Sequence, residues 1–421
     1  MKNKIYLDHS ATTPVDDKVL SVMLPYFNNI FGNASSIHTF GQEAAAGVDK
    51  ARQQVAGFLN CKTDEVVFTS GATESNNLAI KGLISAIFKK GIKNPHVITS
   101  IVEHDAVLEP LMELQKQGVE VTHVGVDKNG VVDIEELKNA IQDNTVLVSI
   151  MHVNSEVGAV MPIREIGKII KKYNENKLKD WKNSRTADRG EAPQSIYFHT
   201  DATQAVNFFN CDVEWNYVDM LSLSAHKIYG PKGVGALYRK TGVPVLALQR
   251  GGHQENNLRS GTLNVSGIVG LGAAIELLGE PKEKGEITDV QKNNNTQIST
   301  VRDLFVSEVQ KNIPEAILNT DRDNATPSHA HFSFLGVEGE SSLIALDLEG
   351  IAVSTGSACA SGSLKASHVL IAMGIKKEVA HNSVRFTLGK HTTEEEVREV
   401  VKKLVPIIER FRKMNPIYHK S

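Results

Sequence analysis

Short apolar segments alternate with amphipathic segments between residues 66 and 239, and this alternation limits the possible folds more than any other feature of the chain. The apolar segments lie at 66–70, 96–100, 146–154, 195–202, 219–226 and 234–239, and the first of them is a β-branched run. Short apolar strands interleaved with helices are typical of a mostly parallel sheet that helices cover on both faces. In such sheets, functional residues gather just beyond the carboxyl ends of the strands.

The length of 421 residues is too great for one small core and fits a large domain plus a smaller one. After about residue 263 the pattern changes to a separate α+β unit, which ends in an amphipathic helix. We therefore expect a large domain over residues 14–262 and a small domain made of residues 1–13 and 263–421. A polar stretch at 172–195 interrupts the alternation, and we expect a helix extension followed by an exposed loop there.

Charge and cysteine content exclude several classes of protein. The net charge of −3 provides no electrostatic footprint for nucleic acid or for an anionic membrane. No apolar run approaches the roughly 20 residues that a membrane-spanning helix needs, and the N-terminus lacks the apolar core of a secretory signal. Three widely spaced cysteines suit a reducing compartment rather than a disulfide framework. The sequence therefore predicts a cytoplasmic protein.

The segment SAHKIYGPKG, residues 224–233, places Lys227 where a predicted strand ends and a Gly/Pro loop begins. An amine in this position can project into a pocket and form a Schiff base with an aldehyde cofactor. Ser224 and His226 provide hydrogen-bond donors for a phosphate beside it. A solvated loop lysine is the ordinary alternative, and the neighbouring motifs decide against it.

Two further motifs fit the same cofactor. Asp201 ends the predicted strand at 195–202, where its carboxylate can pair with a protonated pyridine nitrogen and keep the ring cationic. The segment TSGATESNN, residues 69–77, follows a strand with a glycine turn and a helix start, which is an anion site, and Thr73 adds a hydroxyl. Ordinary helix capping remains the alternative for both motifs.

His104 and Asn154 each follow a predicted strand. The His104 imidazole can stack on a flat ring and move protons, because its pKa lies near the working pH. Asn154 can donate a hydrogen bond to a phenolic oxygen. Ordinary loop and turn positions are the alternatives for these two residues.

Cys359 lies among Gly, Ser and Ala in STGSACASGS, residues 354–363, so we expect its thiol on an exposed, mobile loop. A thiol there can act as a nucleophile, although an incidental loop cysteine is the alternative. Cys61 and Cys211 have no such setting, and we expect structural roles for both. Arg385, in a predicted strand, can hold a carboxylate through a bidentate fork, or it forms a surface ion pair.

His329 and His331 share one face of a predicted strand, as a pair of metal ligands would. The sequence shows no third ligand near them. We therefore expect no metal site.

Together these motifs resemble those of the cysteine desulfurases of the NifS/IscS type, which are fold-type I pyridoxal-phosphate enzymes. The resemblance covers nearly the whole chain, and the order of SAHKIYGPKG, RSGTLN and GSAC is highly specific. It implies a mostly parallel seven-stranded sheet in a large domain and a smaller α+β domain. The cysteine loop resembles that of the group with a long, mobile loop, which serves scaffold and carrier proteins.

The resemblance also implies a role for each site residue. Lys227 is the Schiff-base lysine, His104 the ring-stacking acid/base, Arg385 the substrate-carboxylate clamp and Cys359 the sulfur acceptor. The further cofactor contacts that it implies are Asp201, Gln204, Asn154, Ala72, Thr73, Ser224 and His226. Thr262 matches a phosphate ligand from the neighbouring subunit, which implies a homodimer, and Asn33 matches a substrate contact.

The implied activity converts L-cysteine to L-alanine and leaves a persulfide on Cys359. The sulfur passes to acceptor proteins for iron–sulfur cluster assembly or for other sulfur-containing products. Alternatives are a selenocysteine lyase, another pyridoxal-phosphate enzyme of the class V aminotransferase family, and a non-catalytic protein that holds sulfur-transfer partners. Two departures are Ala34, where the family often has proline, and the long polar insertion at 172–195, which puts in doubt partner docking on that face.

Overall fold

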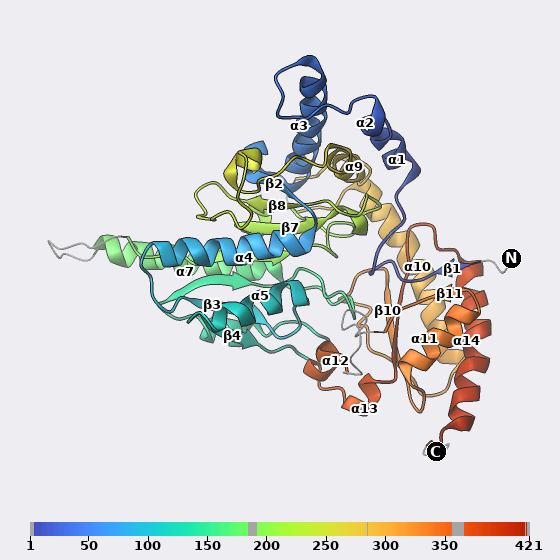
Figure 1. The fold of residues 1–421 in the computed structure, drawn as a ribbon. Coiled ribbons are helices and arrows are strands. Elements are labelled where there is room, and N and C mark those ends of the chain that lie inside the picture. Colours follow the sequence, from blue (N-terminus) through green and yellow to red (C-terminus); the bar gives the residue numbers. More distant parts are fainter. Residues whose placement is uncertain (1–3, 184–191, 284, 356–365, 417, 419–421) are drawn as a thin grey trace.

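A seven-stranded sheet forms the centre of the larger unit in the computed structural model, which describes residues 4–183, 192–283, 285–355, 366–416 and 418 (Figure 1). Its spatial order is β2-β8-β7-β6-β5-β3-β4. β8 runs antiparallel to β2 and β7, and the other neighbours are parallel. The mostly parallel seven-stranded sheet expected from the sequence is confirmed. Its strands are β2 (Val66–Thr69), β3 (His96–Ser100), β4 (Glu120–Val124), β5 (Thr145–Ser149), β6 (Tyr197–Asp201), β7 (Met220–Ser224) and β8 (Gly235–Arg239).

Helices cover both faces of this sheet, which explains why its inner strands are buried almost throughout. Successive side chains of a strand point to opposite faces. On β5, Leu147 packs with α4 (Ala72–Lys89) and α5 (Asp105–Gln115), whereas Val148 packs in the cluster that contains α7 (Ile163–Asn183). Figure 1 shows α4 and α7 on opposite faces of the sheet.

The strand β4 was not expected from the sequence. It lies at the edge of the sheet, pairs with β3 alone, and most of its residues are exposed or half-buried. An edge strand with one exposed face tolerates polar residues, so EVTHV lacks the apolar run that marks the inner strands. The expected strand at 146–154 ends at Ser149, and the residues after it turn across the carboxyl end of the sheet.

A smaller unit has its own core and two further sheets, of order β12-β10-β9 and β1-β11. Phe305, Phe332 and Phe386 pack together in this core, with ring centroids 4.9 to 6.5 Å apart. Its elements are β1 (Ile5–Tyr6), α10 (Asp289–Asn312), β9 (Ala316–Leu318), β10 (His329–Phe334), α11 (Gly339–Leu348), β11 (Ile351–Ala352), α13 (Lys377–Ala380), β12 (Ser383–Thr387) and α14 (Glu394–Met414).

The expected domain division at 262/263 stays a prediction. The helix α9 (Val265–Glu276) packs against α1 and α3 within the hydrophobic cluster of the larger unit. The remaining helices are α1 (Asp17–Met23), α2 (Pro25–Asn28), α3 (Thr39–Leu59), α6 (Ile134–Asn139), α8 (Val213–Asn216) and α12 (His368–Ala372). Among the residues that the structure describes, no helix combines the length and apolar character needed to cross a bilayer.

The polar stretch at 172–195 begins as expected, because α7 continues through it to Asn183. Residues 184–191 lie outside the described part of the chain. The same holds for residues 356–365, which include Cys359.

Candidate active site

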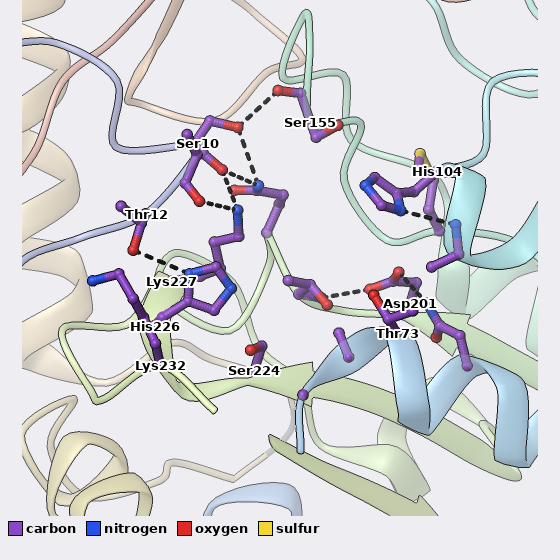
Figure 2. Close-up of a pocket in the computed structure, with 18 of the residues that line it drawn as sticks. Ser10, Thr12, Thr73, His104, Ser155, Asp201, Ser224, His226, Lys227 and Lys232 are labelled. Atoms are coloured by element: carbon purple, nitrogen blue, oxygen red, sulfur yellow. Dashed lines mark hydrogen bonds between the residues drawn. The ribbon is translucent and has the colours of Figure 1, made fainter. Parts of the chain in front are cut away.

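A cavity of about 730 Å³ lies at the carboxyl ends of the sheet strands and brings most of the expected site residues together (Figure 2). The N-terminal segment and β12 of the smaller unit also contribute to its walls. Of the residues singled out from the sequence, those that line it are Ala72, Thr73, His104, Asp201, Gln204, Ser224, His226, Lys227 and Arg385. The parallel strands all end at this edge of the sheet. Residues that follow different strands, far apart in the sequence, therefore meet here.

Lys227 ends a short 3-10 turn, residues 225–227, that directly follows β7. Its Nζ donates hydrogen bonds to the carbonyl oxygens of Ser10 and Ala11, the second at 2.7 Å. Gln204 also donates to the Ser10 carbonyl, at 2.9 Å. Figure 2 shows Lys227 on one side of the cavity and His104 on the other. The lysine amine therefore lies inside the cavity, held by the N-terminal segment.

Asp201 ends β6, and its side chain is almost fully buried. One carboxylate oxygen accepts a hydrogen bond from Asn76 Nδ2 at 2.7 Å, and the other accepts one from the Thr203 N–H at 3.0 Å. Among the described residues, no lysine, arginine or histidine forms an ion pair with this carboxylate. A buried charge without a counter-ion is costly, so this site fits a cationic group of a ligand.

The N-terminus of α4 forms a part of the cavity that suits an anion. Gly71 caps this helix with φ 154° and ψ 178°, a conformation that is essentially confined to glycine. The first N–H groups of a helix have no partner inside the helix, and here they adjoin the cavity at Ala72 and Thr73. Ser224, His226 and Lys232 line the same end. These groups fit a phosphate.

His226 faces this end as a neutral imidazole. Burial, together with Lys227 and Lys232, lowers its pKa to about 4. Its Nδ1 lies 3.1 Å from the Thr12 hydroxyl. A neutral ring can donate one hydrogen bond to a phosphate without adding a charge to the site.

Arg385 approaches the cavity from β12 and is buried. Its Nη2 donates to Asp8 Oδ1 and its Nη1 to the Ser155 carbonyl, both at 2.9 Å. Its Nε is buried without a hydrogen-bond partner among the described residues. The guanidinium is thus fixed in orientation at the wall of the cavity.

A comparison with known protein families identifies the chain. The family model for class V aminotransferases matches residues 5–180 and 188–400. The chain belongs to the class V aminotransferase family. Enzymes of this family use pyridoxal phosphate, so the cofactor expected from the sequence is confirmed.

Similar proteins confirm the resemblance to the cysteine desulfurases. A protein of Dictyoglomus turgidum named cysteine desulfurase IscS is 47% identical over 99% of this chain and 97% of its own length. A cysteine desulfurase of Pongo abelii is 42% identical over 98% of this chain and 84% of its own. A solved NifS-like protein matches with a TM-score of 0.84 and 34% identity, covering 97% of this chain and 100% of its own.

Three expected site residues of this family member lie outside the cavity. Asn154 is buried, and its amide bonds to the Val102 carbonyl and to the N–H groups of residues 156 and 157, as a turn residue does. Asn33 and Thr262 are exposed on the surface. Their roles stay predictions, and so does that of Cys359, which lies outside the described residues.

The other two cysteines are poor nucleophiles. Burial raises the pKa of both the Cys61 and the Cys211 thiol to about 12. His329 and His331 are also buried, and burial lowers the pKa of each to about 3. In the described part of the chain no group of three or more His, Cys, Asp or Glu side chains could hold a metal ion.

Several cavity residues were missed by sequence reasoning, namely Asp8, Ser10, Asn76 and Ser155. Asp8 and Ser10 lie in the N-terminal segment, which forms no strand next to the cavity and carries no local chemical signal. Asn76 lies one helical turn after Ala72 and Thr73. That spacing places Asn76 on the same face of α4 as Ala72 and Thr73. The helical spacing is the one signal that could have identified Asn76 from the sequence.

Glu103, directly before His104, is fully buried. Its Oε1 accepts hydrogen bonds from Ser100 at 2.6 Å and from the Met151 N–H at 2.9 Å, whereas Oε2 has no partner among the described residues. Burial, and after it the charge of Asp201, raises the pKa of Glu103 to about 8. Glu103 is therefore protonated at neutral pH.

This protonation predicts a pH dependence of stability. Between the ordinary pKa of 4.5 and the folded value of about 8, the folded protein keeps a proton that the unfolded chain has released. The free energy of unfolding therefore falls as the pH rises through this window. Glu103→Gln cannot ionise, so its stability relative to wild type should rise by on the order of a few kcal/mol from about pH 5 to about pH 8.

Urea unfolding at several pH values measures this difference, with the exposed Glu340→Gln as the control. A constant difference between Glu103→Gln and wild type across the window would contradict the prediction.

Proposed function

We propose that this protein is a pyridoxal-phosphate-dependent cysteine desulfurase that converts L-cysteine to L-alanine and retains the sulfur as a persulfide on Cys359. One arrangement supports this proposal above all. A lysine amine, a buried carboxylate without a counter-ion and a helix N-terminus share one cavity, and they suit the aldehyde, the pyridinium nitrogen and the phosphate of the cofactor. A relative that is 34% identical, SspA, has a solved structure in complex with cysteine.

In this proposal each group of the cavity contacts one part of the cofactor. Ala72, Thr73, Ser224 and His226 would hold the phosphate, and Asp201 would hold the ring nitrogen. His104 would lie against the ring and Gln204 beside it. When bound, pyridoxal phosphate supplies a cationic ring that withdraws electrons from the α-carbon of an amino acid.

The side chains of the protein would then orient the substrate and move its proton. The Arg385 guanidinium, which lines the cavity, binds the α-carboxylate of cysteine. The Lys227 amine takes the α-proton, since it lies in the same cavity and is a base once it is neutral. The Asp201 carboxylate would face the positive charge of the ring and stabilise it.

Sulfur transfer requires a nucleophile, and we assign this role to the Cys359 thiolate. It attacks the sulfur of the substrate, and the bond between that sulfur and the β-carbon breaks. The electron pair of that bond goes to the β-carbon, which takes a proton and gives alanine. Cys359 keeps the sulfur as a persulfide. A second protein then receives this sulfur, for iron–sulfur cluster assembly or for another sulfur-containing product.

Incubation of the purified protein with L-cysteine, pyridoxal phosphate and a thiol reductant tests the function. We expect equal amounts of alanine and sulfide. Selenocysteine turnover without cysteine turnover would support the lyase alternative instead, and no product from either amino acid would overturn the proposal. The cytoplasmic location expected from the sequence stays a prediction.

We also propose that the active protein is a homodimer. Large apolar side chains are exposed along α1, α2 and the segment that leads into α3, with Phe27 61%, Phe31 65% and Ile37 91% exposed. Exposed apolar patches of this kind mark protein–protein interfaces. Asn33 lies in this segment, and Thr262 is exposed rather than in its own cavity. Both observations suit residues that complete the site of a partner subunit.

The variant Ile37→Asp should dissociate the dimer. A charge in the centre of an apolar interface loses its hydration without gaining a partner, so the dimer dissociation constant should rise at least about 100-fold. Sedimentation velocity over a range of protein concentrations measures it. Leu348→Asp is the control, because Leu348 is 74% exposed on α11, away from this patch. A monomeric wild type would disprove the dimer.

A further inference from the structure

Asn76 is fully buried, and its amide contacts Asp201. Nδ2 donates to the Asp201 carboxylate at 2.7 Å, while Oδ1 is buried without a partner among the described residues. The opposite orientation of the amide would place Oδ1 against the carboxylate oxygen, where two acceptors repel. The hydrogen bond to Asp201 therefore determines how this amide is oriented.

Two titratable groups that interact with Asp201 are uncharged at neutral pH. His199, two residues earlier on β6, lies between the hydroxyls of Ser149 and Ser222, and burial lowers its pKa to about 4. Glu103 is protonated at neutral pH, because burial raises its pKa to about 8. His104 lines the same cavity.

The described hydrogen bonds to the Asp201 carboxylate come from one backbone N–H, that of Thr203, and one side chain, that of Asn76. A short hydrogen bond restricts the rotation of the carboxylate that accepts it. Asn76 is thus the side chain in the described part of the chain that holds the Asp201 carboxylate in place through a direct hydrogen bond.

The position of Asn76 on α4 links the two ends of the cavity. Ala72 and Thr73 present the helix N-terminus, and Asn76 lies one turn further along, roughly 6 Å at about 1.5 Å per residue. One rigid helix thereby sets the distance between the anion-binding end and the carboxylate.

We propose that Asn76 is a positioning residue that orients the Asp201 carboxylate toward the ring nitrogen of pyridoxal phosphate. This inference rests on the proposed function, because it gives Asn76 a role only through the cofactor. Asn76 acts through Asp201 and takes no part in the chemistry itself. Its loss should weaken cofactor binding and alter the electronic state of the bound ring.

The test compares Asn76→Leu with wild type in titrations of cofactor-free full-length protein with pyridoxal phosphate. Leucine has nearly the same size and no donor. A hydrogen bond to a charged group corresponds to about a 10- to 100-fold change, so we expect the dissociation constant to rise by that factor and the visible absorption of the bound cofactor to shift. Asn295→Leu is the matched control, since Asn295 also donates one hydrogen bond, to the Phe208 carbonyl, and has an unpartnered Oδ1.

A second variant, Asn76→Asp, adds a pH profile that a purely structural residue would not change. Two adjacent carboxyls share a proton at low pH, and the protonated one can donate to the other. As the pH rises and this proton leaves, repulsion replaces the hydrogen bond. The affinity of Asn76→Asp for pyridoxal phosphate, relative to wild type, should therefore fall with rising pH. Glu103, His104 and His199 are present in both proteins, so the two pH profiles differ only through the added carboxyl and its effect on these three groups.

Wild-type protein that takes up no pyridoxal phosphate would overturn the proposed function itself. If wild type binds the cofactor, but Asn76→Leu binds within about twofold of it with the same spectrum and Asn76→Asp shows the wild-type pH profile, the inference about Asn76 is wrong.

Discussion

Lys227→Ala should abolish turnover of L-cysteine while the protein stays folded. The side chain lies in the cavity, where its amine bonds to carbonyl oxygens of residues 10 and 11. The amine serves both as the attachment point of the cofactor and as the base that takes the α-proton. Its removal should lower the turnover rate at least about 10³-fold. The measurements are alanine release and the visible absorption of the bound cofactor, which should lose the band of the lysine-linked form.

Two further variants sharpen this prediction. Lys227→Arg keeps a positive charge but cannot form the covalent link, so it should be as inactive as Lys227→Ala. Lys240→Ala removes a half-buried lysine just after β8, outside the cavity, and should retain wild-type turnover. Substantial activity in Lys227→Arg would mean that only the charge at this position matters, and our assignment of Lys227 would then be wrong.

Cys359→Ser should eliminate the persulfide and lower alanine release from cysteine at least about 10²-fold. A hydroxyl is a far weaker nucleophile than a thiolate at neutral pH, and its size is close to that of the thiol. Mass spectrometry of the cysteine-treated wild type should show the mass of one added sulfur atom on the peptide that contains Cys359.

Cys61 and Cys211 provide the internal controls for this experiment. Burial raises the pKa of both thiols to about 12, so neither is a thiolate at neutral pH. Their peptides should gain no sulfur, and Cys211→Ala should still form the persulfide. If Cys359→Ser released alanine at the wild-type rate, sulfur would leave the substrate without this thiol, as in the lyase alternative.

The strands whose position determines the site could be predicted from sequence, because they are buried on both faces. Such strands are buried at every position, as HVITS and MLSLS are, and carry few charged residues before the strand ends. Lys227 and Asp201 were found in this way. The edge strand β4 was missed, because its exposed face allows the polar residues of EVTHV.

The contacts between these motifs needed the folded chain. Nothing near Asp8 indicates that it pairs with Arg385, which is 377 positions further along the chain. Asn76 belongs to a recognised motif, yet only the packing of α4 against the sheet shows that its amide contacts Asp201. The high pKa of Glu103 likewise depends on burial, which adjacent residues do not reveal.

By itself, the sequence determined the fold class, the chemistry expected of the cavity and the identity of its principal side chains, because strand periodicity and the residue types at strand ends are local properties. The tertiary structure alone decided which of these side chains share one cavity, which lie outside it and which neighbours set their charge. Those outcomes depend on distances between segments and on exclusion of water, and both arise only when the chain packs.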